Sequence, residues 1–224
     1  MRKEKRHFLN DYCGGILVAE ITVGYFLEDI GQAAFVQALV ERVAQEVDIH
    51  KRVLNHDPRS VTGGKGRAVT ELKRFLRDVQ KDNASPFDIL VIAIDGNCQG
   101  HLEKRKQLSD TVKQLKYEGD VVYAIPDPHI ERWYLEDASA LARAVKANIQ
   151  PDPPRYKCER GRYKDALRDA LRQAGIMPPL GGIEYASDIA QALDFYSLGQ
   201  VDAGFKHFGD ELRSVLMQRG RLIS

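Results

Sequence analysis

The apolar run from Ile89 to Ile94 constrains the fold of this chain more than any other feature. Six consecutive apolar residues, most of them β-branched, end abruptly at Asp95 and Gly96. A strand without polar alternation is covered on both faces, which is typical of a central parallel strand in an α/β sheet. Such sheets bind ligands at the carboxyl ends of their strands, so Asp95 is the first candidate for chemistry. The alternative for Asp95 is a cap of the following helix.

The neighbouring segments predict a parallel sheet with helices between its strands. Gly15 to Ile21 is expected to form the first buried strand, with Glu20 at its carboxyl end. Further strands are expected at 50–55 and 120–125, and helices at 24–47, 68–82 and 101–117. This alternation predicts an α/β domain over residues 14–137.

The C-terminal part of the chain has a different pattern. A proline-rich connector at 151–157 is followed by helix-like segments at 162–174, 186–196 and 201–219. Residues 138–224 are therefore expected to form a helical extension packed on the α/β domain. The predicted fold class is α/β, with a mostly parallel sheet flanked by helices and a C-terminal helical extension.

The composition is that of an ordinary globular chain. Charged residues make up 29% of its 224 residues and hydrophobic ones 43%, with a formal net charge of +1. This neutral balance argues against nucleic-acid binding by bulk charge alone, but leaves room for a local basic patch. No apolar run approaches the roughly 18 residues of a membrane helix. The apolar run after the basic N-terminus is too short for a signal peptide.

The three cysteines are widely separated in the sequence. Cys13, Cys98 and Cys158 show no CxxC motif and no paired spacing. This distribution predicts a reducing compartment rather than a disulfide framework. Because no membrane segment or signal peptide is expected, the sequence predicts a cytoplasmic protein that does not bind membranes.

Acidic side chains follow several of the predicted strands. Besides Glu20 and Asp95, the turn after the last predicted strand carries Asp127, His129 and Glu131. Acids that converge on one sheet edge repel one another unless a cation joins them, and oxygen ligands favour Mg²⁺ or Mn²⁺. His129 is a candidate general base or metal ligand, with a structural role as the alternative. A position near a helix start, where the dipole favours acids, is the alternative explanation for Asp127.

Two basic segments are candidates for phosphate contacts. The glycine-rich GGKGR loop frees backbone amides beside its cations, but its spacing does not match a Walker A loop, and a flexible connector is the alternative. The KRK run follows Asp95 closely in the sequence, and its alternative is a solvated helix face. The candidate residues are Lys65, Arg67, Lys104, Arg105 and Lys106.

The acidic residues also resemble the pattern of the Toprim domain, which occurs in topoisomerases, DnaG-type primases and OLD-family nucleases. The resemblance rests on a glutamate after the first strand, Glu20, and on a DxD-like element that begins at Asp95. The ERW sequence at Glu131 resembles the E-x-W element of small Toprim-like proteins often found near bacterial defence genes. The resemblance covers residues 14–137, implies a Toprim-like sheet, and gives no role to the helical extension.

Carried over to this sequence, the resemblance makes Glu20, Asp95 and Glu131 the catalytic and metal-binding residues. Two departures would weaken such a site. The second DxD position is Asn97, a neutral oxygen ligand, and Gly24 stands where many relatives carry a second acid. The candidate metal ligands are Glu20, Asp95, Asn97, Asp127 and Glu131.

The leading hypothesis is a Toprim-like nuclease of a bacterial defence system, which hydrolyses phosphodiester bonds with Mg²⁺ or Mn²⁺ and has nucleic acid as its partner. The alternative is a Toprim-like binding or regulatory subunit with little or no activity of its own, acting with a partner such as an ATPase. The retained acids favour the first hypothesis, and Asn97 and Gly24 favour the second. Both hypotheses are compatible with a homo-oligomer.

Overall fold

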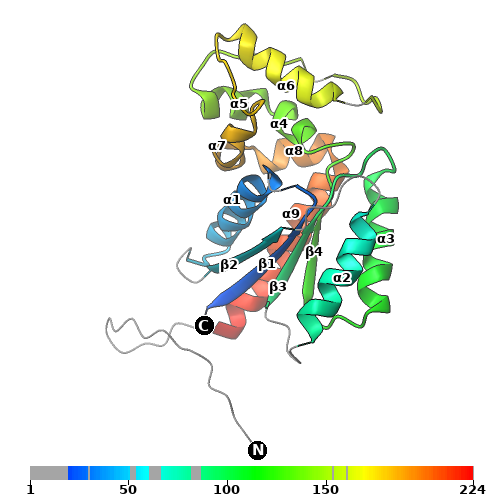
Figure 1. Cartoon of the computed structure of the whole chain (residues 1–224). Coiled ribbons are helices and arrows are strands. Elements are labelled where there is room, and N and C mark those ends of the chain that lie inside the picture. The colour runs from blue at the N-terminus through cyan, green and yellow to red at the C-terminus, as the bar shows by residue number, and fades with distance from the viewer. Residues whose placement is uncertain are drawn as a thin grey trace, which may run out of the picture.

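The computed structural model describes residues 20–29, 31–50, 54–60, 67–81, 87–152, 154–159 and 161–223. Figure 1 shows a parallel sheet with helices on both faces and a group of short helices beyond one end of the sheet. The strands are β1 (Ile21–Leu27), β2 (Leu54–Ser60), β3 (Ile89–Ala93) and β4 (Asp120–Ala124). The longer helices are α1 (Gly31–Glu46), α2 (Ala68–Gln80), α3 (His101–Gln114), α6 (Arg162–Gln173) and α9 (Ala203–Ile223). The shorter ones are α4 (Glu131–Glu136), α5 (Ala138–Val145), the 3₁₀ turn η2 (Ile183–Tyr185), α7 (Ala186–Ala192) and α8 (Phe195–Val201).

β3 lies inside the sheet, as its sequence predicts. The strand order is β2-β1-β3-β4, and all three pairings are parallel. All five residues of β3 are buried, because they alternate between two covered faces. Ile89, Val91 and Ala93 join the core on one face, and Leu90 and Ile92 join the core on the other. The predicted α/β class with a C-terminal helical region is confirmed.

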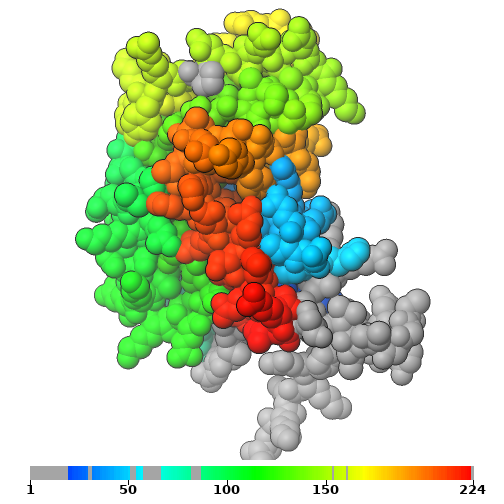
Figure 2. Space-filling view, turned by 180° about the vertical axis from the view of Figure 1, so that it is seen from behind, coloured from blue at the N-terminus to red at the C-terminus, as the bar shows by residue number. Residues whose placement is uncertain are grey.

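Different helices cover the two faces of the sheet. Leu72 of α2 and Leu108 of α3 share a buried cluster with Leu90 and Ile92. On the opposite face, α1 and α9 pack against each other, and α9 also packs against β4. Figure 2 shows α9 lying between α1 and α3 on that side of the molecule. The last helix of the chain therefore belongs to the layers that bury the sheet.

The short helices gather at the carboxyl end of the strands (Figure 1). Trp133 of α4 is fully buried and packs edge-on against Phe205 of α9, with ring centroids 5.1 Å apart. Tyr134 packs against Phe35 of α1 at 4.7 Å. These aromatic contacts fix α4, and with it the turn that follows β4, against both helices of the α1 and α9 layer.

The first strand lies further along the chain than the sequence analysis predicts. The predicted strand at Gly15 to Ile21 is wrong, because the observed strand begins at Ile21, and residues 15–19 lie outside the described part of the chain. The predicted helix from residue 24 is also wrong at its start. Phe26 and Leu27 pair with both β2 and β3, and this two-sided pairing outweighs their helical spacing.

The second strand is also displaced from its predicted place. The weak strand expected at 50–55 is observed as Leu54–Ser60, which includes Pro58. Proline is tolerated there because β2 is the edge strand of the sheet. The predicted helices at 68–82 and 101–117 and the predicted strand at 120–125 are confirmed within a few residues.

Candidate active site at the carboxyl edge of the sheet

Loops at the carboxyl ends of β1, β3 and β4 bring together a group of polar side chains. We call this group the acidic edge site: the acids Glu28, Asp95 and Glu131, with Gln32 and His129. The loop after β3 is held to the segment after β4 by backbone hydrogen bonds. The amides of Ile94, Gly96 and Asn97 donate to the carbonyls of Ala124, Pro126 and Pro128. Pairing thus continues past the regular ladder and sets Asp95 beside the turn that carries His129.

Asp95 lies at the centre of the acidic edge site. The Gln32 Nε2 donates to Asp95 Oδ1 at 2.8 Å, and His129 Nδ1 lies 3.0 Å from Asp95 Oδ2. The backbone N–H of Asp95 donates to Glu28 Oε2 at 3.0 Å, so the Glu28 carboxylate reaches across from the end of β1. The side chains of Asp95 and His129 are each 18% exposed. The arrangement therefore holds Asp95 rigidly and in little contact with solvent.

The electrostatics of the site disfavour a second negative charge. Burial raises the pKa of Asp95 from 3.8 to about 6, the hydrogen bond from His129 lowers it, and the charges of Glu28 and Glu131 raise it. Like charges that are held together in this way are stabilised by a cation. The acidic edge site therefore has the charge pattern that attracts a divalent metal.

Two buried polar atoms beside Asp95 have no hydrogen-bond partner among the described residues. They are Gln32 Oε1 and the hydroxyl of Tyr134. Burial raises the pKa of Tyr134 well above its ordinary value, and the charges of Glu131 and Asp95 add to this effect. Tyr134 therefore stays a neutral hydroxyl that can donate a hydrogen bond. Unpaired buried polar atoms are uncommon, and they concentrate at binding sites.

The donor chemistry of the acidic edge site fits Mg²⁺ or Mn²⁺, because Glu28, Asp95 and Glu131 offer carboxylate oxygens. The side chains are not assembled around one point. Within the described ranges, no group of three or more His, Cys, Asp or Glu side chains is placed to hold a metal ion. Each Asp95 oxygen accepts one hydrogen bond and keeps a further lone pair. A metal would draw the half-buried Glu28 and Glu131 inward.

The predicted role of Glu20 is wrong. Glu20 is exposed and precedes β1, so it lies at the amino end of the sheet. The seven residues of β1 separate it from the carboxyl edge, a distance of about 20 Å at the usual strand rise. Glu28 occupies the position, directly after the first strand, that the sequence analysis assigns to Glu20. Gly24 consequently lies inside β1, where a Cβ would come within 2.4 Å of the Phe87 ring.

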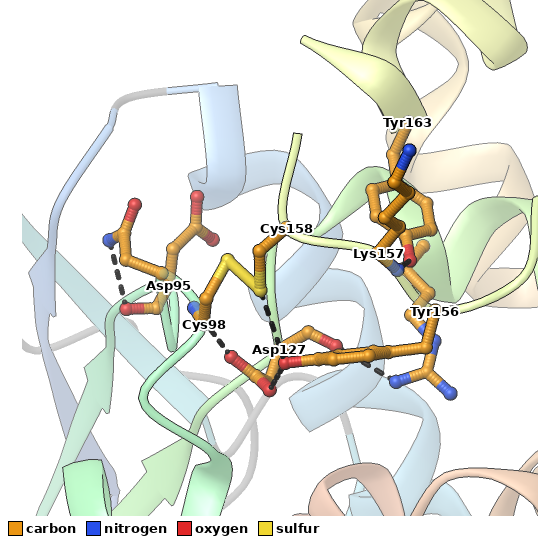
Figure 3. The surroundings of a disulfide bond; sticks show 9 residues. Asp95, Cys98, Asp127, Tyr156, Lys157, Cys158 and Tyr163 are labelled. Carbon is orange, nitrogen blue, oxygen red and sulfur yellow. Dashed lines mark hydrogen bonds between the residues drawn. A yellow bond between two sulfur atoms is a disulfide. The ribbon is translucent and has the colours of Figure 1, made fainter. Parts of the chain in front are cut away.

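Asp127 is close to the site but has a structural environment. It is only 9% exposed. Its Oδ1 accepts the backbone N–H of Cys98 at 2.9 Å, and its Oδ2 accepts the hydroxyl of Tyr156 at 2.8 Å (Figure 3). A Cβ at Gly96 would lie 2.3 Å from Asp127 Oδ1, so only glycine allows this approach. These contacts show Asp127 ordering the loop after β3.

Asn97 shapes the same loop. Its backbone has a φ of 48°, in the left-handed region that asparagine tolerates better than most residues. Its side-chain amide donates to the backbone carbonyl of Asp95 at 3.2 Å. A turn-forming role accounts for an asparagine at this position without any metal.

The predicted phosphate contacts do not form one patch. Arg67 is exposed at the start of α2, and Lys65 lies outside the described residues. Successive residues of a helix point about 100° apart, so the KRK run of α3 is divided. Lys104 is buried, Arg105 forms an ion pair with Glu211 at 2.5 Å, and Lys106 is exposed.

Only part of the ERW sequence faces the acidic edge site. Glu131 acts on Asp95 electrostatically, whereas Trp133 is a core residue. Arg132 donates to the carbonyl of Asp127 at 2.8 Å and lies 3.1 Å from Asp202, which ties the turn to the start of α9. Two of the three residues therefore position the turn and do not contribute chemistry.

The prediction that the cysteines are unpaired is wrong. Cys98 and Cys158 form a disulfide across a sequence separation of 60 residues. Neither residue lies in a motif that marks it, so only the fold brings them together. Cys13 lies outside the described part of the chain.

Comparison with models of protein families, with curated proteins and with solved structures gave no match. The relation to Toprim proteins therefore stays a hypothesis based on short motifs and on the parallel sheet. None of the helices described here combines the length and the apolar character needed to cross a membrane.

Proposed function

We propose that this chain hydrolyses phosphodiester bonds in nucleic acid at the acidic edge site, with Mg²⁺ or Mn²⁺ bound by Glu28, Asp95 and Glu131. The observation that carries the proposal is the position of Asp95, buried at the end of β3 with its pKa raised to about 6 by burial and by two neighbouring acids. Structural acids usually have lowered pKa values, because they are paired with cations or amides. Raised values at the carboxyl edge of a parallel sheet are typical of functional sites.

The residues divide between charge and proton transfer. A bound divalent cation supplies stabilisation of the charge that develops on the phosphate and lowers the pKa of a coordinated water. Because His129 Nδ1 donates to Asp95, the neutral imidazole carries its lone pair on Nε2. His129 is the general base of the proposed reaction, and Asp95 fixes its tautomer and orientation. The Tyr134 hydroxyl is a donor within the same buried region.

Matched variants test the proposal in a nuclease assay on plasmid DNA and single-stranded RNA with Mg²⁺ or Mn²⁺. Asp95→Asn and Glu28→Gln should each lower the cleavage rate by about 100-fold or more, the usual effect of losing a group that acts in the reaction. Glu20→Gln removes a carboxylate from the opposite end of β1 and should leave the rate unchanged. Cleavage that survives Asp95→Asn, or that is lost in Glu20→Gln, would contradict the proposed site.

A binding or regulatory role with a partner protein is the second candidate. It is favoured by the hydrogen bonds that already occupy both Asp95 oxygens and by the dispersed placement of the acids. In this case the purified wild-type chain should bind nucleic acid without cleaving it, and cleavage should appear only when the partner, such as an ATPase, is added. Cleavage by the pure chain would exclude this role.

A further inference from the structure

The disulfide attaches an exposed segment of the C-terminal part to the loop that carries Asp95. Cys98 lies three residues after Asp95, and its Cα is 5.7 Å from that of Cys158. Cys158 belongs to the segment 154–159, which we call the connector and which has no helix or strand. Figure 3 shows the disulfide between this connector and the loop after β3, with Asp127 beneath both.

Few other contacts hold the connector. The Tyr156 hydroxyl donates to Asp127, the Arg132 guanidinium lies 5.6 Å from the centre of the Tyr156 ring, and the Lys157 amide donates to Tyr163 at 3.3 Å. Tyr156 is nevertheless 51% exposed. The disulfide is thus the strongest of the bonds between the connector and the loops of the acidic edge site.

Both sulfur atoms belong to residues on the surface. Cys98 and Cys158 are both exposed, so a small thiolate can reach them. Exposed disulfides exchange with thiols more readily than buried ones, and they are the ones that serve regulation. The left-handed backbone of Cys98, with a φ of 70°, places this residue on the surface side of the loop.

We propose that Cys98 and Cys158 form a reversible thiol–disulfide switch, which fastens the connector beside the acidic edge site when oxidised and releases it when reduced. The co-reactant is a low-molecular-weight thiol. Its thiolate attacks one cysteine sulfur, forms a mixed disulfide and expels the other cysteine as a thiolate, which takes up a proton. A second small thiolate then attacks the mixed disulfide and expels the remaining cysteine. The products are two cysteine thiols and one small disulfide, so two electrons pass from the two small thiols to the protein.

Reduction leaves the connector with the Tyr156 hydrogen bond as its main attachment to the loops. Its amides then exchange with solvent more often, because local opening no longer carries a covalent constraint. The effect on substrate access rests on the proposed function, but the exchange of thiols and of amide hydrogens is measured without substrate. A failure of the switch is therefore distinguishable from a failure of the nuclease proposal.

The test uses the full chain with Cys13→Ser, so that one cysteine pair remains. Protein equilibrated with 10-fold excess oxidised or reduced glutathione, at about millimolar concentration as in a cellular thiol pool, is alkylated and weighed. Hydrogen exchange of the connector is followed on the same samples. We expect no alkylated cysteine in the oxidised sample, two in the reduced one, and connector exchange at least about 10-fold faster after reduction.

Two variants complete the test. Cys98→Ser should show fast connector exchange in both buffers, and the double variant Cys98→Ser, Cys158→Ser should be insensitive to glutathione. The inference is overturned if the folded wild-type pair stays oxidised in reduced glutathione, if it never forms in oxidised glutathione, or if connector exchange is the same in both states.

Discussion

Replacing Asp95 by asparagine should stabilise the protein at neutral pH, although Asp95 is central to the proposed site. The pKa of Asp95 is raised from 3.8 to about 6 in the folded protein, mainly by burial. The folded state therefore holds the Asp95 proton more tightly than the unfolded state does. The stability associated with this proton is fully present below pH 3.8 and is lost as the pH rises through about 6.

The size of the effect follows from the two pKa values. The difference between 3.8 and about 6 corresponds to a cost of about 3 kcal/mol once Asp95 is ionised in both states. Asparagine avoids this cost at every pH, but it keeps only one acceptor oxygen for the donors Gln32 and His129. Losing one of these hydrogen bonds costs about 1–2 kcal/mol. Asp95→Asn should therefore be more stable than wild type by about 1–2 kcal/mol at pH 7.5.

Urea unfolding of wild type and Asp95→Asn at pH 4 and pH 7.5, with the disulfide intact, measures this effect. The difference in unfolding free energy between variant and wild type should rise by about 2 kcal/mol from the lower to the higher pH. Glu20→Gln, an exposed carboxylate at the other end of β1, should change stability by less than about 0.5 kcal/mol at either pH. An Asp95→Asn difference that is the same at both pH values would refute the argument that Asp95 is a destabilising buried acid.

Three further substitutions test the packing around the site. Gly96→Ala should lower the unfolding free energy by about 1–3 kcal/mol in urea unfolding, because its Cβ would lie 2.3 Å from Asp127 Oδ1; an unchanged midpoint would show that the loop can move. Trp133→Ala should cost about 3–5 kcal/mol, because Trp133 is fully buried, and a loss below about 1 kcal/mol would be inconsistent with a core role. Cys98→Ser should lower stability by about 4 kcal/mol, the chain-entropy value for a loop of 60 residues closed to Cys158. Equal midpoints for Cys98→Ser and the oxidised wild type would show that the disulfide does not form in solution.

The interior of the sheet was predictable from the sequence because burial on both faces leaves a direct mark. The run Ile89 to Ile94 has no polar residue, and its alternate side chains enter two separate cores. The amphipathic pattern of α2 was equally clear, since Leu72, Phe75 and Leu76 lie on one buried side. These features depend on short stretches of sequence and on one physical cause.

The first strand was misplaced because two adjacent apolar segments compete for the same role. The segment that ends at Ile21 and the segment from Ile21 to Leu27 have similar composition. Only pairing with β2 and β3 decides between them, and that pairing is a property of the whole sheet. The error moved the predicted acid to Glu20 and hid Glu28, whose sequence signal is its position directly after Leu27.

Other parts of the site depend on contacts between distant segments. Gln32 enters the site from α1, and its hydrogen bond to Asp95 spans 63 residues of sequence. The disulfide joins segments 60 residues apart without a cysteine motif. Trp133 belongs to a sequence that resembles a functional element, yet the structure places it in the core. Short patterns cannot distinguish a residue that supports a site from one that acts in it.

Metal binding by the acidic edge site is the central claim, and calorimetry with Mn²⁺ tests it most directly. We predict that wild-type protein and Glu20→Gln bind Mn²⁺ with equal affinity, whereas Glu28→Gln and Asp95→Asn each weaken binding by about 10-fold or more, since each removes one charged ligand. Equal binding by the wild type, Glu28→Gln and Asp95→Asn, or no binding by the wild type at millimolar Mn²⁺, would contradict the account.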